Sequence, residues 1–390
     1  MLIRKQDILD RAAEWGLRPD VVEKDYVLGW LLAAFAANGV ASKSWVFKGG
    51  TCLKKCFFET YRFSEDLDFS LLPDAPYDET SVRTLIAEVA GSAAEMSGVN
   101  FPAERIDLKI RRDKLGRATY QGRVAYQGPL VVPNWPRVLL DITQHEVVVG
   151  HPVRRPVFHP YPDELPKGAE ALCYSLEELF AEKTRALLER TRPRDLYDVV
   201  HLWDRRDEVA LDSVRAVLTK KCVAKNVTPP TTATLSALVR GSDELRADWS
   251  NMLEHQLPTL PALDGLLDRL DDVLGWIDAP QPTPVPLAAV ASTSGERLVA
   301  PRGGFYWGGG QRLELVRFAG ANRLKIAFTY DGTPRIAEPY SLRRKKTGNL
   351  VLYAWENGAA HIKAFNTAKM FNVTTTHEPF VPRFRVELTG

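Results

Sequence analysis

Long apolar segments and paired cysteines are both missing from this sequence. The longest apolar run, residues 26–37, is too short to cross a bilayer, and the N-terminus lacks the apolar stretch of a signal peptide. The four cysteines (Cys52, Cys56, Cys173 and Cys222) form no C-x-x-C pair and have no matching histidine spacing, which argues against a zinc site or a disulfide framework. We therefore expect a cytoplasmic protein without membrane association.

A strong net charge is also missing, but the charges are unevenly distributed. The net charge is +2, and residues 301–390 contain 14 lysines and arginines against 6 acidic residues, so residues 1–300 are acidic. A basic C-terminal part suggests a polyanionic partner, although a basic surface without a partner explains the charge equally well. The length of 390 residues allows two or three domains.

One stretch near the N-terminus has the composition of a phosphate-binding turn. Residues 45–47 predict a short buried strand, which ends at Gly49 and Gly50, where the backbone can approach a ligand closely. Thr51 predicts a helix start, whose backbone N–H groups and positive dipole end favour a phosphate. Lys54 adds a positive charge one turn later.

Two carboxylates follow on the next predicted strand. Asp66 and Asp68 are two residues apart, so their side chains point to the same face of a strand. Such a pair suits Mg²⁺, which proteins usually hold through one or two carboxylates and substrate phosphates. Asp141, within the apolar run 138–143, is expected to share this metal, and a salt bridge to a nearby arginine is the alternative. A glycine turn beside an Asp-x-Asp pair is typical of nucleotidyl transfer, whereas either motif alone is usually only a turn or a solvated strand edge.

Residues 161–279 are predicted to be mainly helical. Ser175 predicts the start of a helix that carries Lys183. Pro193 predicts the start of another helix, which carries Asp195. The arginines around Asp195 favour an ordered ionic cluster over ordinary surface charge.

A basic hairpin is predicted over residues 105–110 and 119–126. Its positive side chains could follow a phosphate backbone, or they could merely block pairing of an exposed strand edge. They are Arg105, Lys109, Arg111, Arg112, Lys114, Arg117 and Arg123.

The C-terminal part has a different pattern. Residues 280–300 are rich in proline and small residues and predict a stiff linker. Beyond residue 311, short alternating segments and turns at Asp331-Gly332 and Asn357-Gly358 predict a small barrel-like β domain. Its strands are expected at residues 313–318, 324–330, 335–340, 349–355, 361–365 and 384–388.

Four motifs in order resemble those of the AbiEii/AbiGii nucleotidyltransferase toxins. The motifs lie at residues 47–51, 62–69, 174–183 and 193–198, and the resemblance covers residues 15–270. It implies an enzyme that uses Mg²⁺ or Mn²⁺ and a nucleoside triphosphate. Relatives add nucleotides to the 3′ acceptor end of tRNA and so block translation in toxin–antitoxin or phage-defence systems. The implied partners are RNA, above all tRNA, and a cognate antitoxin.

The resemblance also implies an architecture. The fold class is α/β (α+β), with a polymerase-β-like nucleotidyltransferase core at residues 1–160 and a helical subdomain at residues 161–279 that completes the active site. Residues 301–390 resemble a WYL-type domain, which implies an SH3-like small β-barrel.

The family roles follow position by position. The metal ligands implied are Asp66, Asp68 and Asp141, and the nucleotide-binding residues are Gly49, Gly50, Thr51, Lys54, Ser64 and Lys183. Asp195 resembles a motif aspartate that organises Lys183 and the nearby arginines. Two other hypotheses are a degenerate transferase that only senses nucleic acid or another ligand, and a transferase that modifies a protein hydroxyl.

Overall fold

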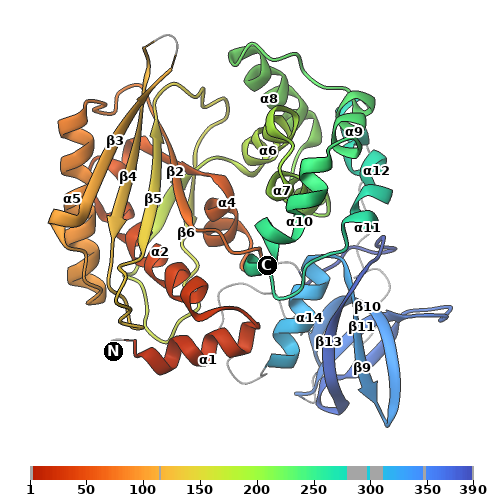
Figure 1. Ribbon diagram of the computed structural model, residues 1–390. Coiled ribbons are helices and arrows are strands. Elements are labelled where there is room, and N and C mark those ends of the chain that lie inside the picture. The colour runs from red at the N-terminus through yellow and green to blue at the C-terminus, as the bar shows by residue number, and fades with distance from the viewer. Residues whose placement is uncertain (1–2, 114–115, 279–296, 299–310, 346–347, 389–390) are drawn as a thin grey trace. The chain divides into compact units, whose positions relative to one another are not determined.

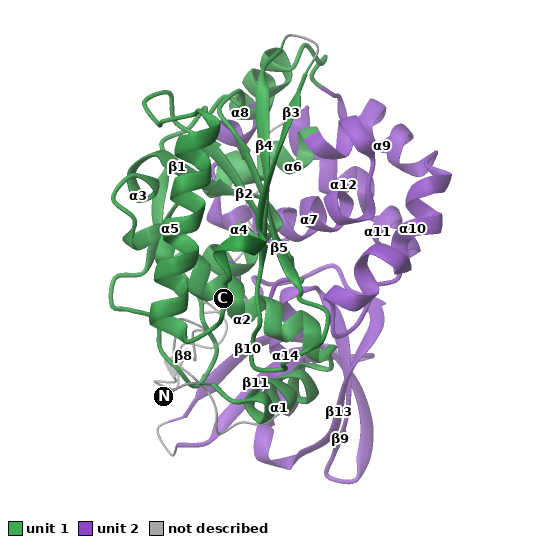
Figure 2. Ribbon diagram, turned by 60° about the vertical axis from the view of Figure 1, so that its left-hand side comes forward, with its two compact units in different colours: residues 1–57, 62–185, 216–229 green, residues 58–61, 186–215, 230–390 purple. Residues whose placement is uncertain are grey.

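The computed structural model describes residues 3–113, 116–278, 297–298, 311–345 and 348–388. The predicted linker therefore lies almost entirely outside the described residues, as does Lys114 of the basic hairpin. The chain forms two compact units (Figure 2). The first comprises residues 1–57, 62–185 and 216–229, and the second comprises residues 58–61, 186–215 and 230–390. The domain boundaries expected from the sequence stay predictions.

A seven-stranded mixed sheet forms the centre of the first unit. The strand order is β3-β4-β5-β2-β1-β7-β6 (Figure 1). Strand β2 pairs antiparallel with β1 and parallel with β5, and the predicted hairpin is confirmed as β3 and β4. The strands are β1 (Trp45–Lys48), β2 (Asp66–Leu71), β3 (Ile106–Arg112), β4 (Ala118–Ala125), β5 (Arg137–Thr143), β6 (Val153–Pro156) and β7 (Glu170–Cys173).

Helices α2 and α5 pack on the apolar face of this sheet, as the contact of Phe35 with Phe69 shows for α2. The side chains of β2 and β5 that project to this face, such as Leu67 and Leu140, are buried. A Cβ at Gly122 of β4 would lie 3.3 Å from Ile86 of α5, which places this helix against the apolar face. The helices that lie wholly in this unit are α1 (Lys5–Trp15), α2 (Pro19–Ala37), α3 (Ala41–Ser44), α4 (Gly49–Cys52) and α5 (Glu79–Ser97). None of the described helices has both the length and the apolar character needed to cross a bilayer.

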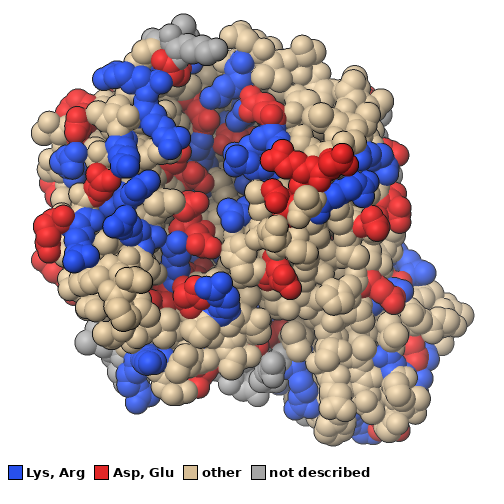
Figure 3. Space-filling view, viewed as in Figure 1, with Lys and Arg blue, Asp and Glu red and all other residues tan. Residues whose placement is uncertain are grey.

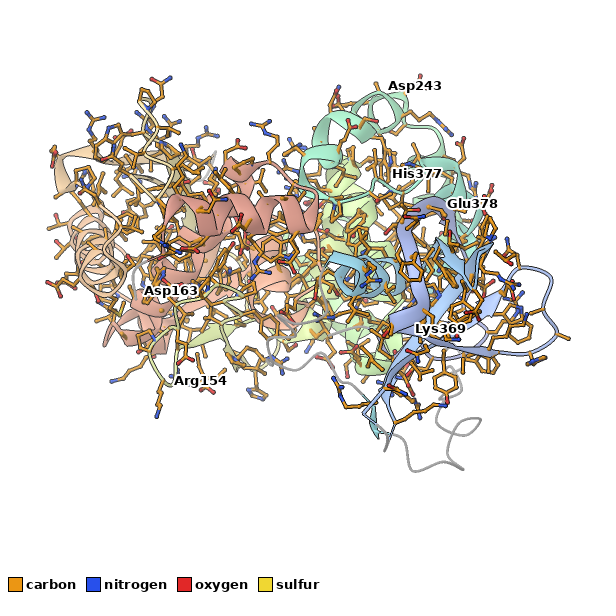
Figure 4. All side chains as sticks on the ribbon, turned by 90° about the horizontal axis from the view of Figure 1, so that it is seen from below. Arg154, Asp163, Asp243, Lys369, His377 and Glu378 are labelled. Atoms are coloured by element: carbon orange, nitrogen blue, oxygen red, sulfur yellow. The ribbon has the colours of Figure 1, made fainter. Side chains whose placement is uncertain are left out.

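Buried polar contacts anchor α2 to its surroundings within the first unit. The Tyr26 hydroxyl donates to Asp163 at 2.8 Å. Asp163, labelled in Figure 4, lies in the segment between β6 and β7. Asp25 forms a fully buried ion pair of 2.9 Å with Lys55, which lies in the π-helix Leu53–Phe57 that follows α4. These contacts hold the helical turn after β1 in place.

The second unit consists of helices and a C-terminal antiparallel sheet. Its helices are α7 (Pro193–Trp203), α9 (Thr232–Arg240), α10 (Asp243–Leu253), α11 (Leu263–Asp268), α12 (Leu270–Leu274) and α14 (Gln311–Ala321). Helices α6 (Leu176–Arg190) and α8 (Leu211–Ala224) have residues in both units. The sheet has the order β12-β11-β10-β9-β13, with β8 beside β10. Its strands are β8 (Arg297–Leu298), β9 (Leu324–Tyr330), β10 (Thr333–Arg344), β11 (Leu350–Glu356), β12 (Lys363–Asn366) and β13 (Met370–Pro379).

The described C-terminal residues form an open sheet and not the predicted SH3-like small β-barrel. Within the described residues the outer strands β12 and β13 do not pair with each other, so the sheet stays open. Helix α14 occupies the position of the strand expected at residues 313–318. The buried residues Val316 and Ala319 are three apart, which suits a helix that packs against β9, β10 and β13. The strand expected at residues 384–388 is also wrong, and β13 was missed.

Candidate functional site

A row of polar side chains crosses the middle of the first sheet. In the strand register, Lys48 of β1 is opposite Asp68 of β2, and Asp68 is opposite Asp141 of β5. Asp141 is in turn opposite Gln121 of β4. Directly paired residues project to the same face, and Asp66 joins them from two positions earlier on β2. The three aspartates expected to share a metal thus lie next to one another on the face away from α5.

The glycine turn touches this row directly. Gly49 has a φ of +81°, and a Cβ at this position would lie 2.2 Å from Asp68 Oδ2, so only glycine allows so close an approach. The Thr51 hydroxyl donates to the backbone carbonyl of Asp66 and ties the turn to β2. Helix α4 begins at Gly49, so Thr51 lies inside the helix and not at its start as expected.

The other predicted nucleotide-binding residues lie on both sides of the turn. A Cβ at Gly50 would lie 3.0 Å from the Ser64 hydroxyl and 2.6 Å from the Arg62 guanidinium. Both residues therefore flank the turn, and Arg62 is an addition to the predicted set. Lys54 is buried, with its ammonium 4.4 Å from the centroid of the Phe63 ring, a favourable cation–π contact. A role for Lys54 toward phosphate stays a prediction.

The charges around Asp68 suit a divalent cation. Burial raises the pKa of Asp68 to about 6, Lys48 and Lys183 oppose this shift, and Asp66 and Asp141 add to it. A carboxylate whose pKa is raised by burial and by acidic neighbours gains from a nearby positive ion. The donor set therefore fits a divalent metal. The three carboxylates are not drawn together within 4.8 Å, since among the described residues only a cysteine group meets that distance.

Lys48 is a site residue that sequence reasoning missed. Its side chain is buried beside Asp68 and forms ion pairs with Glu146 and, at 3.3 Å, with Glu182 of α6. Lys221 of α8 also pairs with Glu182, at 2.9 Å. Burial opposes the ionisation of Glu182, but Lys48 and Lys221 lower its pKa well below the usual value. These partners lie far from Lys48 in the sequence, so no local motif signals them.

Lys183 and Asp195 belong to different units. Lys183 is a buried residue of α6 in the first unit and lowers the pKa of Asp68. Asp195 is a buried residue of α7 in the second unit and accepts two hydrogen bonds from Arg190, of 2.7 and 2.9 Å. Of the ordered ionic cluster expected around Asp195, the pair with Arg190 is present. Its role in organising Lys183 stays a prediction.

Three cysteines converge beside the glycine turn, which their spacing did not indicate. The sulfur atoms of Cys52, Cys56 and Cys173 all lie within 4.8 Å of one another, and all three residues are fully buried. Cys173 joins the other two because β7 pairs with β1, with Cys173 opposite Phe47. All four cysteines are free thiols, and the group is one ligand short of a four-coordinate zinc site.

Comparisons with known proteins bear on this site. The family model described as nucleotidyl transferase AbiEii toxin of type IV toxin–antitoxin systems matches residues 30–275, which include the glycine turn and all the site residues above. A solved structure of MenT4, a nucleotidyltransferase toxin from Mycobacterium tuberculosis H37Rv, is 20% identical, with a TM-score of 0.44 over 72% of this chain and 91% of that chain. No curated protein sequence matches the chain.

Proposed function

Because the chain belongs to the AbiEii family of nucleotidyltransferase toxins, we propose that it transfers a nucleoside monophosphate from a nucleoside triphosphate to the 3′ end of an RNA. Family membership makes the chain a nucleotidyltransferase and implies a triphosphate substrate, a divalent metal and an antitoxin partner. The observation that carries the proposal is the contact between Gly49 and Asp68, which brings a phosphate-binding turn against a carboxylate row.

The residues of the site have distinct tasks in this reaction. Asp66, Asp68 and Asp141 would hold Mg²⁺ or Mn²⁺, and the metal would stabilise the charge that develops on the transferred phosphoryl group. The turn at Gly49 exposes backbone to the triphosphate without a side chain in the way. Lys183 brings a positive charge close to Asp68 and would stabilise the pyrophosphate leaving group.

The acceptor we propose is the 3′ hydroxyl of tRNA, and its extension would stop translation. The test is incubation of the purified chain with each of the four α-labelled triphosphates and total tRNA. Label is expected in RNA, and it should be lost when the 3′ diol has been oxidised with periodate. Label on protein would identify a protein hydroxyl as the acceptor. Absence of label with both Mg²⁺ and Mn²⁺ would favour a binding protein and overturn the proposal.

Removal of divalent metal is expected to stop the reaction completely. Since the carboxylate row alone repels the triphosphate, EDTA should reduce incorporation to background, and an excess of Mg²⁺ or Mn²⁺ should restore it. The measurement is label incorporation before chelation, after chelation and after metal is added back. Full activity in EDTA would contradict the assignment of the three aspartates.

Lys183→Ala is expected to slow transfer on the order of 100-fold, the usual cost of losing one charged group that stabilises the transition state. Steady-state rates with varied triphosphate give the size of the loss. Lys220→Ala is the matched control, because Lys220 is an exposed lysine of α8. Equal rates for the two variants would remove Lys183 from the site.

A further inference from the structure

We propose that the uncovered face of β3, β4 and β5 binds the RNA strand whose 3′ end is extended, an inference that rests on the proposed function. Lys109, Arg111 and Arg123 supply positive charge on this face, and Leu139 supplies an apolar contact next to the aspartates. We call these four residues the acceptor face.

The strand register places the acceptor face in line with the carboxylates. Lys109 of β3 is opposite Gln121 of β4, and Gln121 is opposite Asp141. One row of side chains therefore runs from Lys109 through Gln121 and Asp141 to Asp68. With strands about 4.8 Å apart, Lys109 lies three strand spacings, or roughly 14 Å, from Asp68.

The two neighbouring rows carry the rest of the face. Arg123 of β4 is opposite Leu139 of β5, and Leu139 is opposite Asp66 of β2. Arg111 lies two residues beyond Lys109 on β3 and so projects to the same side. The row of Arg123 begins at the exposed Asp107 of β3. A phosphate backbone that crosses at Lys109 and Arg111 would instead meet cations first and the metal-binding carboxylates last.

Among the described residues, other basic residues of the hairpin have internal partners that those of the acceptor face lack. Arg112 donates to the Gly116 carbonyl at 3.0 Å, and Arg117 pairs with Asp113 at 2.6 Å. No ion pair is found for Lys109, Arg111 or Arg123 within the part of the chain that the structure describes. Figure 3 shows lysine and arginine side chains gathered over the strands labelled β3, β4 and β5 in Figure 1, with acidic side chains beside them.

Protection of the sheet edge does not account for the whole arrangement. Charges that only block edge pairing belong on β3, the outermost strand, but Arg123 lies on the second strand and Leu139 on the third. Leu139 is 42% exposed, directly between Arg123 and Asp66. An exposed leucine framed by charges suits a ribose or base whose phosphates are held on either side.

The experiment compares two triple variants of the full chain that lose the same charge. The test variant carries Lys109→Gln, Arg111→Gln and Arg123→Gln. The control carries Lys43→Gln, Arg112→Gln and Lys167→Gln, three exposed residues outside the acceptor face. Fluorescence anisotropy with a 5′-labelled single-stranded RNA, without nucleotide, gives the Kd over a series of salt concentrations.

The test variant is expected to bind RNA on the order of 100-fold more weakly at 0.1 M salt, because each lost phosphate contact costs about fivefold there. The slope of log K against log salt concentration should become less steep by about 2, which corresponds to about 0.7 for each lost contact with a single strand. Leu139→Ser should weaken binding without a change in that slope. The inference is overturned if the test variant binds RNA with wild-type affinity, or if the control variant loses as much affinity for RNA as the test variant.

Label transfer to RNA, measured in parallel, separates this inference from the proposed function. If the wild type extends RNA and the test variant does so at an unchanged KM for RNA, then the acceptor face does not bind the RNA. The proposed function is unaffected by that result. If the wild type binds RNA through the acceptor face but does not extend it, then the proposed transfer to RNA is wrong. The inference that the acceptor face binds RNA then holds.

Discussion

Asp68→Asn is expected to reduce nucleotide transfer on the order of 1000-fold or more, the upper range for loss of a single group that stabilises the transition state. Asparagine keeps the size of the side chain beside Gly49 but removes the charge at the centre of the carboxylate row. Neither Asp66 nor Asp141 can replace it, because each occupies a different position in the register. Incorporation of labelled nucleotide under single-turnover conditions measures the loss.

The same variant should be at least as stable as the wild type. Because burial raises the pKa of Asp68 to about 6, the folded chain binds this proton more tightly than the unfolded chain. The ionised carboxylate therefore destabilises the fold at neutral pH, and this cost fades as the pH falls below about 6. Removal of the charge should raise the melting temperature at pH 7.5, with a smaller gain at pH 5.

Asp74→Asn is the matched control, since Asp74 is an exposed aspartate in the segment after β2. Its activity and its melting temperature should both equal those of the wild type. Retained transfer in Asp68→Asn would eliminate the carboxylate row as the catalytic centre. A large fall in melting temperature would instead identify Asp68 as a structural residue.

Gly49→Ala is expected to lose activity on the order of 100-fold, because displacement of a reacting group by about 1 Å has an effect of this size. The new methyl group would lie 2.2 Å from Asp68 Oδ2, so either the carboxylate or the turn must move. The positive φ of +81° adds about 1–2 kcal/mol of backbone strain. Transfer assays and thermal unfolding of the same preparation measure the two effects.

Gly168→Ala separates strain from collision. Gly168 has a nearly equal φ of +80°, but a Cβ there would meet no atom within 4 Å. Both alanine variants should therefore lose the stability that the strained φ costs, Gly49→Ala should lose more because of the collision, and only Gly49→Ala should lose activity. Similar activity in the two variants would show that the contact with Asp68 has no part in the reaction.

The local parts of the site could be predicted from the sequence, and the distant parts could not. The glycine turn and the Asp66/Asp68 pair are readable because a turn and a two-residue strand period are local patterns. The apolar run around Asp141 indicates a strand, but only the parallel pairing of β2 with β5 places that carboxylate opposite Asp68. Lys48 was missed because its partners Glu146 and Glu182 lie 98 and 134 residues away.

The errors have similar causes. The cysteine spacing gave no sign of a cluster because β7 brings Cys173 beside the turn from more than a hundred residues away. Residues 313–318 read as alternating, but the apolar positions also fit a helix, and packing against the C-terminal sheet decides between the two patterns. A short apolar segment does not distinguish these patterns by itself.

The side-chain alternation along β5 puts a proposed metal ligand and a proposed RNA contact on the same face. Asp141 and Leu139 project to one face, and the intervening Leu140 is buried on the other. An inserted or deleted residue between β4 and β5 can be absorbed by their connection, but one inside β5 would exchange the two faces. The carboxylate would then enter the core, and a leucine would take its place among the proposed metal ligands. Insertions and deletions within this strand should therefore be rarer among natural variants than amino-acid replacements on its uncovered side.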